Sequence, residues 1–530
     1  MTPTLTRWLA ATAACGALTA AVLLLPGPGG YAQAPKAATP KAGGPVSAIH
    51  CRSCHAGPMS EDEEKRNPEG FAGFREYKRQ GVTEFVRLNE SGTWAKDDLH
   101  AVAHKNIEPA KDPDGTRNLA LQMQDILQPH RPAEYEVHKA AECLTCHAVD
   151  LTAGQGVALK DKRPEHFQTT YGVSCEACHG FAENWFAPHV LETWRTTDPK
   201  IKEGLGLVDL RDPYTRAMKC ASCHVGNKAE GKFVTHEMYA AGHPPLPPFE
   251  VVTFANDAPR HYMPHRENKA LAAMGPAAAW KNFHYRENEC ADARALAFGT
   301  VATFEATMQL LADDAAATAK SGELLDFAHF DCFACHHDLK VPSVRPKRGI
   351  PGRPTMRPWE TLQSVLQHSQ TAPGIDTEKV TKTAGDIRDG LVALHKGLDL
   401  KPFGQPGQIA EQARGLVGPC QALKDELAPL VYDPAQTEAL YRMLADRLRK
   451  ADGLDHDTAQ HMIWSLRVLQ EELRASKAHD ELEKITPFHV RGPKREPVAG
   501  ERLKMRLERV GKFDPALFLP RALEWLKEQP

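Results

Sequence analysis

Apolar and polar residues alternate in the C-terminal part of the chain with the spacing of amphipathic helices. One set of apolar residues steps by four and three, as on one face of a helix: Val380, Ala384, Ile387, Leu391, Leu394 and Leu398. Asp433 and Pro434 are typical of an N-cap and a first-turn proline, and they predict a helix through Leu448. Residues 409–427 and 462–473 predict two more helices. Four helices of similar length indicate an antiparallel bundle.

The chain before residue 341 has no such regular pattern. No stretch there sustains the alternation of a β-strand, and the segments between its recurrent cysteine motifs are short. A helix is predicted from Trp94 to His104. Residues 291–319, rich in Ala, Leu, Met and Thr, predict one long helix or two. The expected fold class is therefore mainly α with extensive loops.

Proline and glycine mark the borders of these regions. Residues 342–358 form the clearest border, because five prolines stand there among Arg, Lys and Gly. The predicted organisation is a signal peptide at 1–34, a linker at 35–46, a first domain at 47–341, a Pro/Arg-rich linker at 342–358 and a C-terminal helical domain at 359–530.

The first residues have the features of a secretory signal. Arg7 precedes an apolar run at 8–25, and residues 32–34 have the small-x-small pattern of a cleavage site. The alternative is an uncleaved anchor, because the run is barely long enough to span a bilayer. In both cases the body of the chain is expected to be exported, for example to the periplasm, with membrane contact only if the segment stays uncleaved.

The charge balance excludes one class of partner. Lys and Arg number 65 against 68 Asp and Glu, and no block of basic residues stands out. We therefore expect no nucleic-acid partner.

A pentapeptide of the form Cys-x-x-Cys-His occurs five times. In a c-type haem attachment site with this spacing, two thiols add to the vinyl groups of one haem and the histidine binds the iron. The sequence therefore predicts five covalently attached haem c groups. Their thioether bonds are assigned to Cys51, Cys54, Cys143, Cys146, Cys175, Cys178, Cys220, Cys223, Cys332 and Cys335. Their proximal iron ligands are assigned to His55, His147, His179, His224 and His336.

Cysteine pairs at this spacing also bind zinc or form disulfides. Histidine accounts for 25 of the 530 residues. Its occurrence after all five pairs by chance has a probability on the order of three in ten million, which favours haem over zinc. Of the other cysteines, Cys15 lies in the export segment. Cys290 and Cys420 are expected to be buried free thiols, with a disulfide between them as the alternative.

Each haem iron has a second axial position, and histidine is the abundant donor for it. His236 and His243 stand about two helical turns apart, and His243 precedes a proline. His189 follows the third motif by ten residues, and His100 lies on the predicted Trp94 helix. His337 adjoins a motif histidine, so it can serve only a neighbouring haem. Further candidates are His50, His104, His138, His166, His329, Met218, Met238, Met263 and Met274.

Longer strings resemble the multihaem cytochrome c-554-like family. They are Trp94–His100, Gly172–Gly180, His189, Cys220–Gly226 with Thr235–His243, and Phe330–Leu339. The resemblance spans roughly residues 48–345. It implies an electron-transfer cytochrome whose haems lie in close parallel or perpendicular pairs with mostly bis-histidine ligation. It favours His100, His189, His236 and His243 as ligands, whereas the fifth motif and the added helical domain depart from the four-haem pattern.

Together these features predict an exported five-haem cytochrome that transfers electrons along closely packed haems to and from redox partner proteins. Its architecture would be a multihaem core followed by a helical bundle. The alternative is an oxidoreductase that acts on a small nitrogen or sulfur species at an open haem. Related nitrite reductases usually carry Lys in place of one motif histidine, and all five motifs here end in His. This difference favours a carrier over a catalyst.

Overall fold

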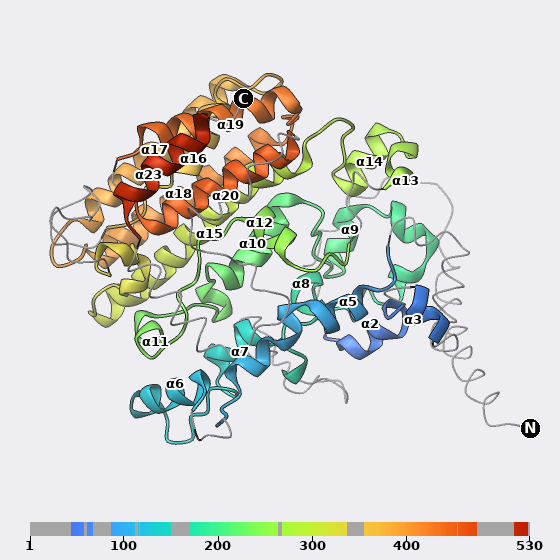
Figure 1. Cartoon of the computed structure of the whole chain (residues 1–530), viewed down its shortest axis with the longest axis horizontal. Helices are drawn as coiled ribbons and strands as arrows, with labels where there is room; N and C mark the ends of the chain where they lie inside the picture. The colour runs from blue at the N-terminus through green and yellow to red at the C-terminus, as the bar shows by residue number, and fades with distance from the viewer. Residues whose placement is uncertain are drawn as a thin grey trace, which may run out of the picture. The chain divides into compact units, whose positions relative to one another are not determined.

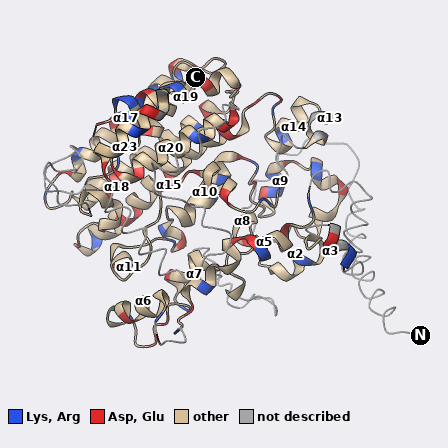
Figure 2. Cartoon of the chain, in the orientation of Figure 1, with Lys and Arg blue, Asp and Glu red and all other residues tan. Residues whose placement is uncertain are grey.

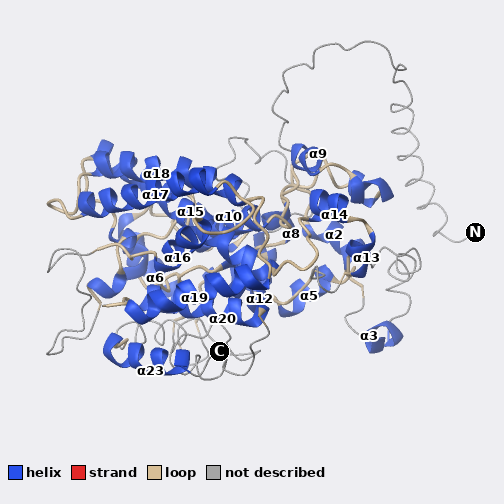
Figure 3. Ribbon diagram, turned by 90° about the horizontal axis from the view of Figure 1, so that it is seen from above, coloured by secondary structure: helices blue, strands red, loops and turns tan. Residues whose placement is uncertain are grey.

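The computed structural model describes residues 44–57, 61–66, 86–111, 115, 117–149, 169–262, 268–336, 355–452, 454–473 and 513–527. These residues form helices and loops (Figure 3). The described chain has only two isolated β-bridges, Lys111 with Arg117 and Asn227 with Lys232. The predicted mainly α fold with extensive loops is confirmed. Several sequence predictions fall outside the described residues: the signal peptide, most of both linkers, His166, Met263 and His337.

The described residues between 44 and 290 form short helices that loops connect (Figure 1). The α-helices are α2 (Ala48–His55), α3 (Glu61–Arg66), α5 (Glu90–Asp97), α6 (Leu119–Leu127), α7 (Ala141–His147), α8 (Cys175–His179), α9 (Pro199–Gly204), α10 (Pro213–His224), α11 (His236–Ala240), α12 (Val251–Asp257), α13 (Lys269–Ala273) and α14 (Pro276–Phe283). The 3₁₀ helices are η2 (Leu99–Ile107), η3 (Gln128–His130), η5 (Thr169–Tyr171), η6 (Pro188–Val190), η7 (Glu192–Thr196) and η8 (Lys228–Glu230).

Four of the five motif histidines are the last residue of a helix. Helices α2, α7, α8 and α10 each end at the histidine of their motif. Asp212 fixes the start of α10, because its carboxylate accepts a hydrogen bond from the Thr215 amide (2.8 Å) and Pro213 occupies the first turn. In these four motifs the pentapeptide therefore forms the last turn of its helix, and the histidine is the final helical residue. The fifth motif differs, since its cysteines lie on and just after the 3₁₀ helix η11 (Cys332–Ala334).

Of the two options expected from the sequence, one long helix or two, the structure has one long helix, α15 (Ala291–Ser321). It is long and apolar enough to cross a bilayer, but most of its side chains are buried against other helices of the described chain. It contacts α10, which carries the fourth motif, and α18 in the C-terminal region. The 3₁₀ helix η10 (Phe327–His329) follows α15 and leads to the fifth motif.

The C-terminal helices follow the predicted pattern. They are α16 (Glu360–Ser369), α17 (Thr377–Leu398), α18 (Pro406–Leu427), α19 (Pro434–Lys450), α20 (His456–Glu472) and α23 (Pro515–Lys527). Helix α19 begins at Pro434, and the Asp433 side chain caps it by accepting a hydrogen bond from the Gln436 amide at 2.8 Å. The apolar residues that predicted α17, from Val380 to Leu398, are all buried.

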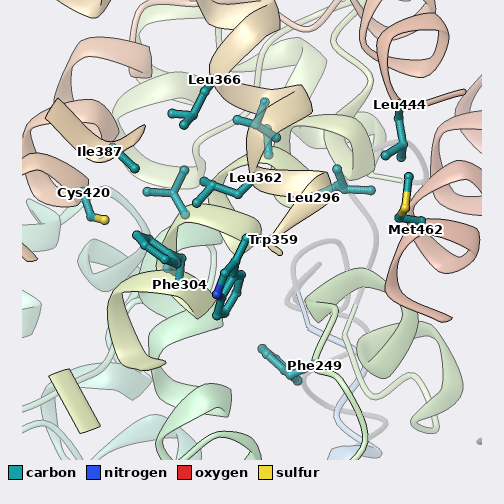
Figure 4. Close-up of a cluster of buried hydrophobic side chains, with 14 of the residues drawn as sticks. Phe249, Leu296, Phe304, Trp359, Leu362, Leu366, Ile387, Cys420, Leu444 and Met462 are labelled. Atoms are coloured by element: carbon teal, nitrogen blue, oxygen red, sulfur yellow. The ribbon is translucent and has the colours of Figure 1, made fainter. Parts of the chain in front are cut away.

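A single hydrophobic cluster joins the C-terminal helices to α10, α12 and α15 (Figure 4). Phe304 of α15 meets Trp359 edge to face, with ring centres 4.9 Å apart. Cys420 and Cys290 belong to the same cluster as buried free thiols, as expected from the sequence. The cluster thus spans residues on both sides of the predicted border at 342–358. The division into two domains stays a prediction.

The buried His461 of α20 should make the stability of the fold decrease at acidic pH. Its Nδ1 bonds the Thr361 hydroxyl at 2.9 Å, and burial together with the charge of Arg357 lowers the pKa of His461 to about 3. The unfolded chain, with a histidine pKa of about 6.5, binds a proton that the folded chain excludes. The contribution of His461 to the free energy of unfolding should therefore be fully present above about pH 6.5. Below that pH it should fall by about 1.4 kcal/mol per pH unit.

We expect His461→Asn to remove this slope from the free energy of unfolding measured between pH 5 and 6.5. The matched control is His130→Asn at an exposed histidine, which should keep the wild-type slope. An unchanged slope in His461→Asn would contradict the assignment.

Candidate haem-binding site

Three motif histidines face a second histidine from a distant part of the chain. His55 at the end of α2 faces His189 of η6, with ring centres 6.4 Å apart and planes inclined by 16°. His147 faces His243 at 6.3 Å and 79°. The fourth motif follows the same pattern, with the His224 ring 6.1 Å from the His100 ring at 87°. These ring-centre separations exceed van der Waals contact between the rings.

The ring separations fit a metal ion held between two imidazoles. An imidazole nitrogen binds a transition metal at about 2.0–2.1 Å. Two such bonds in line, each extended by about 1.1 Å from nitrogen to ring centre, place the ring centres roughly 6.2–6.4 Å apart. The three observed values lie at or beside this range. The residues present therefore fit a haem iron with two axial histidines.

Hydrogen bonds at Nδ1 fix the direction in which the paired rings point. The Nδ1 of His147 donates to the Ala103 carbonyl at 3.0 Å, and the Nδ1 of His243 donates to the Pro244 carbonyl at 2.8 Å. His189 Nδ1 donates to the Phe186 carbonyl. Because Nδ1 is occupied, Nε2 is left as the nitrogen that binds a metal.

In two pairs the partner of Nδ1 is a carboxylate instead of a carbonyl. His55 Nδ1 donates to Glu90 Oε2 at 2.8 Å, and His100 Nδ1 donates to Asp98 Oδ1 at 2.9 Å. Burial opposes ionisation of both acids, but the hydrogen bonds from the histidines lower the pKa of Glu90 and of Asp98. A carboxylate partner makes an imidazole a stronger donor to iron and stabilises the ferric state. The haems of these two pairs should therefore have lower potentials than the haem of the His147 pair.

We expect Glu90→Gln to raise the midpoint potential of the haem at the first motif. The neutral amide donates less electron density through His55, and a tenfold change in the balance of the two oxidation states corresponds to about 59 mV for one electron. Spectroelectrochemical titration of the purified protein should show a rise of this order. Glu108→Gln is the matched control, because Glu108 bonds His104, which faces no motif histidine in the described chain, at 3.0 Å. A rise of equal size in the control would contradict the assignment.

The first and third motifs are neighbours. Glu176, inside the third motif, accepts hydrogen bonds from the amides of Val46 and Ser47, both at 2.8 Å, just before α2. The thiols of Cys51 and Cys175 lie close together, and their interaction raises the pKa of Cys51 and lowers that of Cys175. A residue at a variable position of the pentapeptide thus anchors the helix that carries another motif.

The remaining motifs are also neighbours in space, one after another. The third motif adjoins the fourth, since the thiol of Cys178 lies near those of Cys220 and Cys223. The fourth adjoins the second, because the Cys223 and Cys146 thiols lie close enough that their interaction raises the pKa of Cys146 and lowers that of Cys223. Tyr239 lies beside the second pair and the fifth motif. Its ring centre is 6.0 Å from that of His243, and burial together with the nearby Cys332 thiol raises the pKa of Tyr239. The order in space is therefore first, third, fourth, second, fifth.

A continuous cavity of about 3200 Å³ follows the first four motifs of this series. Its lining includes the motif cysteines and the rings of His100, His189, His243 and His261. A bound small molecule fills roughly 300–1,000 Å³, so the cavity has room for several haem groups. No described residue of the fifth motif lines the cavity.

The third-motif histidine, His179, has no histidine at the pair spacing within the described chain. His261, which sequence reasoning did not single out, is near it: burial and the charge of His261 lower the pKa of His179 to about 4. His261 Nδ1 donates to the Pro259 carbonyl at 3.4 Å. The sequence around His261 has no helical periodicity and no motif, so His261 could not be recognised as a ligand from the sequence.

The fifth motif is the most open to solvent. Cys335 and His336 are both exposed. His236, a predicted distal ligand, is exposed on α11 and meets Phe327 edge to face at 5.7 Å. In the described chain it faces no motif histidine, and His337 lies outside the described residues.

The other candidate donors have partners of their own or lie apart from the pairs. His329 Nε2 bonds the Asp314 carboxylate at 3.0 Å, and His138 Nε2 bonds Glu136 at 3.3 Å. His50 is exposed and meets the edge of Phe186. Of the described methionines named above, Met238 is a buried lining residue of the cavity, and Met218 and Met274 are half-buried.

Thiols at haem-attachment spacing, imidazole pairs whose ring separations would fit one metal ion between them, and a long shared cavity are together the features of a c-type cytochrome. Comparison with known proteins leads to the same class. The profile of the family described as cytochrome c554 and c-prime matches residues 89–180, a segment that contains the second and third motifs and His100. Comparisons with curated proteins and with solved structures gave no match.

The match confirms the resemblance to a cytochrome c554-like family over that segment. The chain is a haem cytochrome with covalently bound haem c, and its general role is electron transfer. The haem supplies the one-electron chemistry. The protein would supply axial imidazoles and the hydrogen bonds that orient them.

Proposed function

We propose that the chain is an exported cytochrome that carries five haem c groups and passes electrons among them. The observation that carries this proposal is the set of three histidine pairs with ring centres 6.1–6.4 Å apart. Each pair supports one six-coordinate, low-spin haem with a comparatively low potential. Such haems exchange electrons with neighbours and do not bind substrates, which favours a carrier.

The order of the motifs supports a continuous path for electrons. Thiols of neighbouring motifs lie close enough to shift each other's pKa at Cys51 with Cys175 and at Cys146 with Cys223. The haems attached there would therefore lie edge to edge or face to face, at separations that allow fast transfer. The exposed fifth motif forms one end of the series and the first motif the other, and a redox partner protein would bind at either end.

The two remaining motifs need distal ligands from the rest of the chain. We assign His261 to the haem at His179, because the two side chains are close enough for their charges to interact. We assign His236 to the haem at the fifth motif, whereas His337, which adjoins His336, can serve only a neighbouring haem. Helix α11, which carries His236, lies beside that motif, since Tyr239 of α11 is near Cys332.

Export follows from the predicted signal at 1–34 and from the chemistry of attachment, which joins haem to Cys-x-x-Cys-His outside the cytoplasm. We expect the body of the chain in the periplasm or an equivalent compartment. Fractionation of cells with an antibody to the chain checks this, and recovery of haem-loaded protein in the cytoplasm would contradict it.

Haem counting and electron paramagnetic resonance test the proposed function. The pyridine haemochrome assay should give five haems per chain. The ferric protein should show a rhombic low-spin signal from the near-parallel His55 and His189 rings, and strongly anisotropic signals from the two near-perpendicular pairs. Three high-spin haems instead would contradict the bis-histidine assignments.

The same electron paramagnetic resonance spectrum distinguishes the electron carrier from a second candidate function, an oxidoreductase. An oxidoreductase for a small nitrogen or sulfur species needs an open iron, and His179 is the motif histidine in the cavity for which the described chain has no paired ring. A high-spin ferric signal that shifts when nitrite or hydroxylamine is added would favour this enzyme. A purely low-spin spectrum would favour the carrier.

A further inference from the structure

Lys202 is a buried cation that no acid contacts directly in the described part of the chain. It lies on α9 with only 2% of its surface exposed. Its ammonium makes no hydrogen bond or salt bridge within the described chain, and its nearest aromatic contact is the Trp194 ring, with Nζ 5.3 Å from the ring centre. An unpaired buried charge is unfavourable by several kcal/mol, so such a group is normally paired with an anion.

The acids around Lys202 are already occupied. Asp209 accepts hydrogen bonds from Arg211 Nε at 2.7 Å and from His284 Nε2 at 3.3 Å. Asp198 bonds Lys281 Nζ at 2.9 Å and caps α9. Burial and the repulsion of Arg211 lower the pKa of Lys202 to about 8, against the smaller opposing effect of Asp209 and Asp198. Figure 2 shows that Lys and Arg elsewhere are interspersed with Asp and Glu.

Lys202 lies on the wall of the cavity, beside the third motif. Both Lys202 and Trp194 line the cavity. The Leu207 amide donates to the Lys202 carbonyl at 3.1 Å, and the next amide, of Val208, donates to the His179 carbonyl at 3.0 Å. These two bonds tie the end of α9 to the histidine that would bind the third haem.

Glycine allows this close approach. Gly180 follows His179 with φ +83°, and a Cβ there would lie 2.1 Å from the Gly206 carbonyl oxygen. The loop after α9 is therefore pressed against the third motif. A haem bound at His179 would have its periphery within reach of this wall of the cavity.

We propose that Lys202 binds a propionate carboxylate of the haem attached at the third motif. The propionates are the carboxylate groups that a haem c brings into the cavity, and a carboxylate forms a charge-assisted hydrogen bond with an ammonium. This inference rests on the proposed function, because it requires a haem at His179. The cation also raises the potential of that haem, since a nearby positive charge disfavours the ferric state.

The test compares Lys202→Met, Lys202→Arg and the control Lys200→Met in the full-length, haem-loaded protein. Lys200 carries the same charge on the same helix but is exposed. The readouts are haems per chain, resonance Raman bands of the propionate groups, and spectroelectrochemical potentials. We expect Lys202→Met to lower the potential of one haem and to shift one propionate band, and Lys202→Arg and Lys200→Met to stay close to the wild type.

Each outcome decides the matter. Fewer than five haems in the wild type would weaken the proposed function, whereas five haems with no shift in Lys202→Met would overturn this inference alone. If Lys202→Met loses a haem while Lys202→Arg keeps it, the charge is needed for haem binding and the proposal stands. If both variants lose it, the side chain acts by packing and the proposal fails.

A free anion could supply the same carboxylate-like chemistry. Titration of the wild type with sulfate or nitrite at constant ionic strength separates the two sources. A potential that depends on the added anion in the wild type, but not in Lys202→Met, would overturn the propionate assignment in favour of a solution anion. A shift in Lys202→Met that is the same with either anion supports the propionate.

Discussion

His243→Met is expected to raise the midpoint potential of the haem at the second motif by on the order of 0.1–0.2 V, a fraction of the roughly 0.8 V that axial ligands span. The His243 ring faces His147 at 6.3 Å and is oriented by its hydrogen bond to the Pro244 carbonyl. A thioether donates less charge to ferric iron than an imidazole and therefore favours the ferrous state. Spectroelectrochemistry measures the shift, and a new absorption band near the red end of the ferric spectrum would accompany iron–sulfur bonding.

His236→Met is the matched control for this substitution. His236 lies seven residues earlier in the same segment, is exposed, and contacts Phe327 instead of a motif histidine. It should leave the haem at the second motif unchanged. If both variants shifted that haem equally, or if His243→Met left every potential unchanged, His243 would not be the ligand.

Replacement of both fourth-motif cysteines, Cys220 and Cys223, by alanine is expected to prevent accumulation of folded protein. The fourth motif lies between the third and second motifs on the wall of the cavity, on a helix that packs against α15. Loss of its haem would leave several hundred Å³ unfilled, at a cost on the order of 5–10 kcal/mol. That cost is comparable with the whole stability of a domain.

The corresponding double substitution of Cys332 and Cys335 provides the comparison. Cys335 is exposed, and no described residue of the fifth motif lines the cavity. This variant should lose one haem per chain and remain folded, as judged by haem content and thermal unfolding. Equal accumulation of the two variants would contradict the central position given to the fourth haem.

The motifs and the helices could be predicted from the sequence because both depend on local spacing. Five pentapeptides give ten thiols and five proximal histidines without any knowledge of the fold. The face of α17 follows from residues three and four apart, and the start of α19 follows from Asp433 and Pro434. These signals are complete within a few residues of chain.

The pairing of histidines could not be predicted in the same way. His55 meets His189 only because Glu176 fastens the start of α2 to the third motif, and that contact joins residues far apart in sequence. His236 and His243 looked alike in sequence, yet only His243 faces a motif histidine in the described chain. His261 carried no signal of spacing or flanking residues. Loop conformation decides these cases, and it depends on long-range contacts.

The closely spaced thiols of neighbouring motifs have a consequence for how the protein matures. In the apoprotein a two-electron oxidant could join Cys51 to Cys175, or Cys146 to Cys223, because the two thiols of each pair lie close enough to interact. Each such crosslink would block two attachment sites at once. We therefore expect maturation to need a reductant, or cofactor loading before the motifs come together.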